Sequence, residues 1–344
     1  MEYFLGIDYQ TWWFMVIGGV FTGYAILDGF DLGTGTLHLF FKKEQSRRIA
    51  LNAIGPVWDG NEVWLVIGGG ALFSGFPKVY ASLLSAFYTP FMLFLVLLIL
   101  RAISIEFRSK EEMFWWRKMW DISFAVSSTI IGFVLGIVLG NVLAGIPLDK
   151  HGDAVVPFIS LFTPFTIFVG ITTVALFSMH GAIYLVMKTE DRLYDRLTIF
   201  VRRTTIFFVI SVVMLSFYTL LYMPMLTERI KSEPWLFIIP VMMIFSIANI
   251  TRQISKKKYL WAFLSSAISI SLLLIIVAIE LYPILLPSTQ DATHNLTIYN
   301  ASSSNEALEI MLIMAAIGVP IVASYTTFVF WTFKGKVKMD EMSY

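Results

Sequence analysis

The sequence predicts an all-α integral membrane protein, and three observations support this prediction. Hydrophobic residues make up 57% of the 344 residues and charged residues only 14%, whereas soluble domains carry roughly 25% charged residues. The mean hydropathy is +0.75. Apolar runs longer than about 18 residues recur along the chain, and each is long enough to cross a bilayer. Such segments must be helical, because lipid offers no partner for an unpaired backbone N–H or C=O group.

Composition also excludes several classes of protein. The formal net charge of +1 does not fit a basic nucleic-acid-binding protein, so we expect no nucleic acid partner. The chain contains no cysteine, which excludes disulfides, Cys-ligated zinc, iron–sulfur clusters and thiol nucleophiles. The first ten residues carry Glu2 and Asp8 but no basic residue. A secretory signal needs a positive start, so we expect an N-terminus that is itself translocated.

The apolar runs predict one polytopic membrane domain over residues 1–344 with about nine spanning helices. They lie at approximately 10–41, 51–75, 77–101, 119–144, 157–187, 203–223, 234–250, 259–282 and 306–333. Several exceed the roughly 20 residues that a span requires, so we expect these helices to tilt. The division of 203–250 into two helices depends on the polar interruption Thr227–Pro234 and the basic run Ser255–Lys258.

The distribution of basic residues predicts the orientation of the chain. If the N-terminus lies outside and the C-terminus inside, 21 of the 25 basic residues fall in inner segments. Those segments are 42–50, 101–118, 188–203, 251–258 and 334–344. One missed helix would invert every later loop, so the asymmetry supports the count of spans. All connecting segments are short, so any chemistry must take place inside the membrane, at its faces or on a partner.

Four acidic residues fall within the first two predicted helices. Asp28 and Asp31 are three residues apart, as are Asp59 and Glu62, so each pair shares one helix face. Charged groups within spans are costly and mark ion or proton pathways. The alternative is that Trp, Asn or backbone donors satisfy each acid, which then only fixes helix packing. Trp58 beside Asp59 is a candidate for orienting that carboxyl or lining a site for a hydrophobic tail, with plain packing as the alternative.

The depth of two of these acids is predicted to match. Asp31 lies 11 residues before Lys42, and Asp59 lies 11 residues after Arg48. At about 1.5 Å per residue, both lie roughly 16 Å from the cytoplasmic edge. Because the first two helices form an antiparallel hairpin with a short loop, we expect Asp31 and Asp59 to face each other.

Histidine placement does not favour a haem or metal site on this chain. His151 and His294 fall in outer loops. His38 lies about 6 Å and His180 about 12 Å from the inner edge, so their depths do not suit one bis-histidine haem. We predict polar or interfacial histidines and no metal site.

Two further patterns predict packing. Asp121 lies one turn from Arg117 and Lys118, which favours an interfacial ion pair. Three glycines at intervals of four predict the close approach of another helix: Gly132, Gly136 and Gly140.

Four blocks of the sequence resemble subunit II of the cytochrome bd quinol oxidases. They are ILDGFDLGTG (Ile26–Gly35), the block Asn52–Ala81 that contains PVWDGNEVW, FRSK with WRKMWD (Phe107–Lys110 and Trp116–Asp121), and Pro287–Ser304. The likeness extends from the first helix to the last and is weaker over roughly 190–260.

The resemblance implies the haem-free half of a membrane heterodimer in the bacterial plasma membrane. Subunit I of this family holds haem b, haem d and the quinol-oxidising loop, and the complex reduces O2 to water with protons from the cytoplasm. Asp31 and Asp59 match residues of the family's cytoplasmic proton pathway, and we add Asp28 and Glu62 as candidates. Trp58 matches a residue near a structural quinone in some members. No catalytic residue is expected on this chain.

We therefore predict two four-helix bundles plus one peripheral helix, supporting a haem-bearing subunit I and sharing in proton delivery. Membrane lipid and small single-span accessory subunits are further expected partners. One alternative is a proton-coupled transporter that uses Asp31 and Asp59, although transporters often show internal repeats and none is evident. A second alternative is a cytochrome that binds haem itself through His38 and His180.

Overall fold

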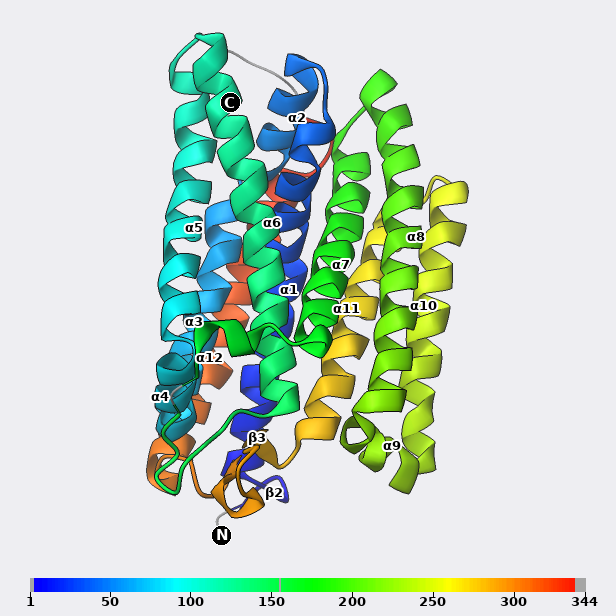
Figure 1. The fold of residues 1–344 in the computed structure, drawn as a ribbon. Coiled ribbons are helices and arrows are strands. Elements are labelled where there is room, and N and C mark those ends of the chain that lie inside the picture. The colour runs from blue at the N-terminus through cyan, green and yellow to red at the C-terminus, as the bar shows by residue number, and fades with distance from the viewer. Residues whose placement is uncertain (1–2, 155, 338–344) are drawn as a thin grey trace.

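The computed structural model describes residues 3–154 and 156–337, and it is almost entirely helical (Figure 1). The α-helices are α1 (Tyr9–Leu37), α2 (Glu44–Ile54), α3 (Trp58–Gly75), α4 (Pro77–Ala86), α5 (Tyr88–Phe107), α6 (Phe114–Ala144), α7 (Pro164–Lys188), α8 (Asp191–Tyr222), α9 (Glu228–Ser232), α10 (Ile238–Ser255), α11 (Tyr259–Leu281) and α12 (Asn305–Thr332). The strands are β1 (Tyr3–Phe4), β2 (Ile7–Asp8), β3 (Ile284–Leu286) and β4 (Leu296–Thr297), which pair as two short hairpins. The predicted all-α class is confirmed.

Eight helices of the described residues are long and apolar enough to cross a membrane: α1, α5, α6, α7, α8, α10, α11 and α12. The remaining predicted range, 51–75, contains α3, which packs along α1 but carries Asp59, Asn61 and Glu62 in its first two turns. These polar residues make α3 the least lipid-like of the nine long helices. The structure therefore places helices in every predicted range, with the polar one next to α1.

Two predicted helices are each interrupted. The range 51–75 contains the end of α2 and all of α3, separated at Gly55–Val57. Pro56 lacks an amide hydrogen and restricts the residue before it, which ends a helix. The range 77–101 is likewise divided into α4 and α5 at Phe87. The shorter helices α2 and α4 lie at opposite ends of the molecule (Figure 1).

The helices form two groups of four. Helices α1, α3, α5 and α6 make one group, and α7, α8, α10 and α11 make the other, with contacts of α7 to α1 and α6 joining them. The most apolar window of α7 is 83% buried, so this helix is the centre of the molecule. The corresponding window of α12 is only 6% buried, and α12 touches α1 and α3 from outside. Two four-helix bundles plus one peripheral helix were predicted, and this arrangement is observed.

Glycines allow the backbones to approach closely where the two bundles meet. A Cβ atom on Gly33 of α1 would lie 1.8 Å from the carbonyl oxygen of Phe177 on α7, and one on Gly181 would lie 2.6 Å from the Gly33 backbone. A Cβ atom on Gly136 of α6 would lie 2.6 Å from Cα of Gly170. The predicted close approach along the glycine pattern of α6 is confirmed, and α7 is the helix that approaches.

Candidate functional site

A buried ion-pair cluster lies inside the first bundle. Arg101 of α5 donates from Nη2 to Oδ1 of Asp28 on α1 at 2.6 Å, and from Nη1 to Oε2 of Glu62 on α3 at 3.0 Å. The side chains of Arg101 and Asp28 are fully buried, and that of Glu62 is 20% exposed. Because charges are costly inside a membrane, one guanidinium shared by two carboxylates holds α1, α3 and α5 together and partly neutralises the acids.

Asp31 occupies a neighbouring buried position one turn along α1. Its Oδ2 atom accepts a hydrogen bond of 2.7 Å from Nδ2 of Asn61, which also donates to the Leu27 carbonyl at 3.2 Å. The side chain of Asp31 is fully buried. Asp31 therefore belongs to the same interior as Asp28 but contacts an amide instead of the guanidinium.

Asp59 does not meet Asp31 inside the chain, contrary to the expectation that the two carboxyls face each other. Asp59 is exposed in the first turn of α3, whereas Asp31 is covered by Asn61. Spacing along each helix does not determine which face of α3 turns toward α1. Trp58, the neighbour of Asp59, is 8% exposed and packs in the core.

Several atoms of this interior keep unused hydrogen-bonding capacity. Around Arg101, four of the buried polar atoms without a hydrogen-bond partner among the described residues lie close together: Oδ2 of Asp28, Oδ1 of Asp31, Nε of Arg101 and the hydroxyl of Tyr24. Buried polar groups are normally hydrogen bonded, to protein or to ordered water. These four atoms on α1 and α5 leave hydrogen-bonding capacity unused in the interior of the first bundle.

Arg101 is the member of this buried cluster that the sequence pattern did not predict. The predicted span 77–101 ends at Arg101, at the border of an inner segment, but α5 continues to Phe107 and carries Arg101 within it. The available signal was the apolar stretch AISI directly after Arg101, which would have extended the helix. An arginine inside a span requires an acidic partner, and Asp28 supplies it.

A second charge cluster lies at the basic end of the same bundle. Asp121 accepts from Arg108 at 2.6 Å and from Arg47 at 2.9 Å, and its Oδ1 atom lies 2.5 Å from Nε2 of His38. The predicted pairing of Asp121 with Arg117 and Lys118 is therefore wrong. Arg117 and Lys118 precede Asp121 on the same helix, α6. The side chains that contact the Asp121 carboxylate come from other segments: the end of α1, helix α2 and the segment after α5.

His38 and His180, the two histidines that could form a haem pair by sequence, both contact other groups of the chain. Nε2 of His180 lies 3.0 Å from the Ile26 carbonyl, which can only accept, so this nitrogen carries the proton and donates. Nδ1 of His180 lies 2.6 Å from the hydroxyl oxygen of Ser266. With His38 held by Asp121, this geometry does not suit haem ligation. Among residues 3–154 and 156–337, no group of three or more His, Asp or Glu side chains is arranged to hold a metal ion.

Comparisons with known proteins agree with this architecture. Residues 9–333 match the family model of cytochrome bd terminal oxidase subunit II. The chain is 30% identical to cytochrome bd-I ubiquinol oxidase subunit 2 of Escherichia coli K12, with 98% of each chain covered. It is 32% identical to cytochrome bd ubiquinol oxidase subunit 2 of Bacillus subtilis, with 96% of this chain and 97% of the relative covered.

The fold is similar to a solved bd oxidase structure from Geobacillus thermodenitrificans, with a TM-score of 0.77 and 18% identity over 94% of this chain and 98% of the other. This likeness supports the fold, and the sequence relatives support the family. The transporter alternative therefore loses its basis. The chain belongs to the cytochrome bd terminal oxidase subunit II family and is a multi-pass membrane subunit of a quinol:O2 oxidoreductase of the respiratory chain.

Proposed function

We propose that this subunit delivers cytoplasmic protons to a haem-bearing subunit I through the acids around Arg101, in addition to supporting that subunit. The observation that carries the proposal is the Asp28–Arg101–Glu62 cluster, which begins in the fully buried interior and ends at a partly exposed carboxyl on α3. A structural ion pair needs only one acid for one guanidinium. Here two acids share Arg101, and Asp31 and Asp59 lie one turn from them.

The order of the groups along α3 suggests a direction. Asp59 lies in the first turn of α3 and is therefore closer than Glu62 to α2, which precedes α3 and lies at one end of the molecule (Figure 1). A proton would pass from Asp59 to Glu62 and then to Asp28 and Asp31, with water between the carboxylates. Arg101 keeps its proton throughout, because a guanidinium is not deprotonated in proteins. It would therefore stabilise the carboxylates without carrying protons itself.

The partner would cover the outer face of α3. Asp59 is exposed there beside the large apolar side chains of Val63 and Val66, which are 47% and 71% exposed. A carboxyl facing acyl chains would be costly, so this face suits contact with another protein. We assign it to subunit I, which would hold haem b and haem d and supply the redox chemistry. Small single-span accessory subunits are further expected partners.

Further features of the proposal are orientation and quinone contact. The basic end of the molecule would face the cytoplasm of a bacterial cell, with the N-terminus outside and the C-terminus inside. Quinol and O2 are then substrates of the complex, not of this chain alone.

Trp58 remains the candidate neighbour of a structural quinone, although its ring packs in the core.

The test of proton delivery uses variants that cannot ionise. Asp31→Asn, Asp59→Asn and Glu62→Gln keep similar volume, and Asp291→Asn in an outer loop is the matched control. If these carboxyls relay protons, each of the first three should slow quinol-driven O2 reduction by roughly tenfold or more, with full haem content in the same preparations. Loss of haem in proportion to loss of activity would instead assign these residues a structural role.

A separate measurement tests where the haems lie. The reduced-minus-oxidised spectrum of this chain purified alone should lack haem bands, and the bands should be present when subunit I copurifies. Haem bands from the chain alone would contradict the proposed haem-free role and revive ligation by His38 and His180.

A further inference from the structure

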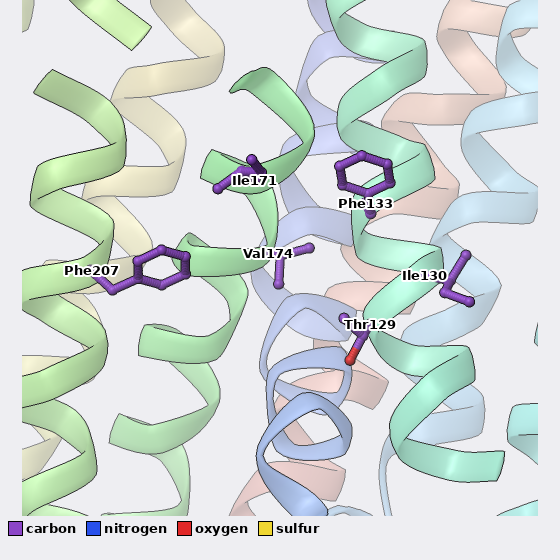
Figure 2. A pocket seen from close by; sticks show the side chains of 6 residues that line it. All are labelled: Thr129, Ile130, Phe133, Ile171, Val174 and Phe207. Atoms are coloured by element: carbon purple, nitrogen blue, oxygen red, sulfur yellow. The ribbon is translucent and has the colours of Figure 1, made fainter. Parts of the chain in front are cut away.

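An apolar groove opens between the two bundles on the side away from α12. Six side chains line it: Thr129, Ile130 and Phe133 of α6, Ile171 and Val174 of α7, and Phe207 of α8 (Figure 2). Its volume is about 260 Å³ and its surface is entirely apolar. The one hydroxyl in the lining, that of Thr129, donates to the Ala125 carbonyl of its own helix at 2.7 Å. The groove therefore offers contact to hydrocarbon only.

An exposed arginine lies one helical turn from this groove. Arg203 precedes Phe207 by four residues on α8, so both side chains share one face of the helix. Arg196 lies seven residues before Arg203, on nearly the same face. Both arginines are exposed, and neither forms an ion pair with a carboxylate among the described residues.

The arginines of the first bundle behave differently. Arg47 and Arg108 pair with Asp121, and Arg101 pairs with Asp28. The guanidinium groups on the outer face of α8 are thus left to interact with something outside this chain. At the surface of a membrane, the abundant anionic group is the phosphate of a lipid headgroup.

Other charges near the groove add to the positive potential. The ring of Phe200 on α8 lies 6.0 Å from that of Phe40, which brings the exposed Lys42 and Lys43 after α1 to the same side. Exposed acids on this side include Glu190 and Asp195, and neither forms an ion pair with Arg203 in the described part of the chain. Positive charge therefore prevails above the groove.

The vertical spacing suits a glycerophospholipid. Phe207 is 16 residues from the start of α8, or about 24 Å from that end, and Arg203 is about 6 Å nearer to it. A long arginine side chain extends its charged head toward the interface while its stem lies on apolar surface. In this order, a lipid phosphate can lie at Arg203 while its acyl chain extends past Phe207 into the groove.

We propose that the groove between α6, α7 and α8, together with Arg203, binds one anionic glycerophospholipid, with an acyl chain in the groove and the phosphate at the guanidinium group. Neither feature alone identifies the ligand. An isoprenoid chain would use the groove without needing Arg203, and a free phosphate ion would use Arg203 without needing the groove. The combination requires a ligand with both parts.

The test is a lipid titration of the purified oxidase complex, read by native mass spectrometry. The probes are phosphatidylglycerol and phosphatidylcholine with identical acyl chains. The intact complex should retain phosphatidylglycerol about fivefold more tightly, the preference that one well-placed arginine supplies. Arg203→Gln should abolish the preference, whereas Arg202→Gln, an exposed neighbour on another face of α8, should preserve it.

A second pair of variants tests the groove. Ile130→Trp should fill the groove and remove the site for both lipids, whereas Val241→Trp, which is exposed on α10 and does not line the groove, should leave binding unchanged. Haem content and intact mass verify assembly of each variant. Equal retention of both lipids by the unmodified complex, equal effects of Arg202→Gln and Arg203→Gln, or binding that is insensitive to Ile130→Trp would overturn the proposal. Displacement of the lipid by inorganic phosphate alone, or by a neutral isoprenoid alcohol regardless of Arg203, would overturn it in favour of those ligands.

Discussion

Arg101 of α5 and Asp28 of α1 form an ion pair of 2.6 Å in which both side chains are completely excluded from the surface. The pair connects two helices that are separated by α2, α3 and α4 in the chain, and Glu62 of α3 contacts the same guanidinium group at 3.0 Å. One side chain therefore joins three helices of the first bundle. This geometry makes Arg101 the structural centre of the proposed proton pathway.

Removal of Arg101 alone should strongly destabilise the subunit. Arg101→Met leaves Asp28 as a buried charge without a partner, and breaking a buried pair in this way costs about 3–5 kcal/mol. The double variant Arg101→Met, Asp28→Leu should recover part of this loss, because apolar replacement of both members of the buried pair is often neutral, whereas Glu62 still loses its contact with the guanidinium group. Thermal unfolding of the complex measures both effects, with Arg117→Met, whose pair with Glu44 is partly exposed, as control. Equal losses in the single and double variants would refute the coupling.

The crossing of α1 and α7 should not tolerate a methyl group. Gly33→Ala places Cβ within 1.8 Å of the Phe177 carbonyl oxygen, so the two backbones must separate. Such overpacking costs about 1–3 kcal/mol or more. Gly18→Ala on the same helix meets nothing within 4 Å and should leave the melting temperature unchanged. Similar melting temperatures for the two variants would show that this crossing is not tightly packed.

Loss of the Asp121 charge should lower the stability of the protein more than loss of the Glu44 charge at the edge of the same cluster. Asp121→Asn withdraws the charge that pairs with Arg108 and Arg47, and losing hydrogen bonds to charged groups costs about 1.5–3 kcal/mol each. Glu44→Gln alters a carboxylate that is 43% exposed, where a pair contributes about 0–1 kcal/mol. Urea or thermal unfolding of the two variants should rank Asp121→Asn as clearly less stable. The reverse order would mean that the buried cluster is already compensated by water.

Single cysteines can establish the orientation, because the chain contains none of its own. Ser255→Cys lies exposed at the end of α10 near the basic residues, and Lys150→Cys lies exposed in a loop at the opposite end. An impermeant maleimide applied to intact cells should label Lys150→Cys, and it should reach Ser255→Cys only after permeabilisation. The opposite pattern would invert the topology and exclude proton entry at Asp59 from the cytoplasm.

The sequence alone determined the class of the protein and the position of its long helices. This follows from local physics: a run of apolar residues in lipid has no alternative to an α-helix, and length limits where each helix can end. The glycine pattern of α6 was also readable, because small residues at intervals of four always share one face. Even the break between α2 and α3 had a local signal in Pro56.

The tertiary structure alone decided which polar groups meet. The sequence identified Asp28, Asp31, Asp59 and Glu62 as candidates, but not that Arg101 joins two of them or that Asp59 faces outward. It paired Asp121 with residues of its own helix, whereas His38, Arg47 and Arg108 approach it from other segments. Spacing along one helix fixes which residues share a face. The rotation of that face toward a neighbour depends on packing over the whole bundle, which no local pattern records.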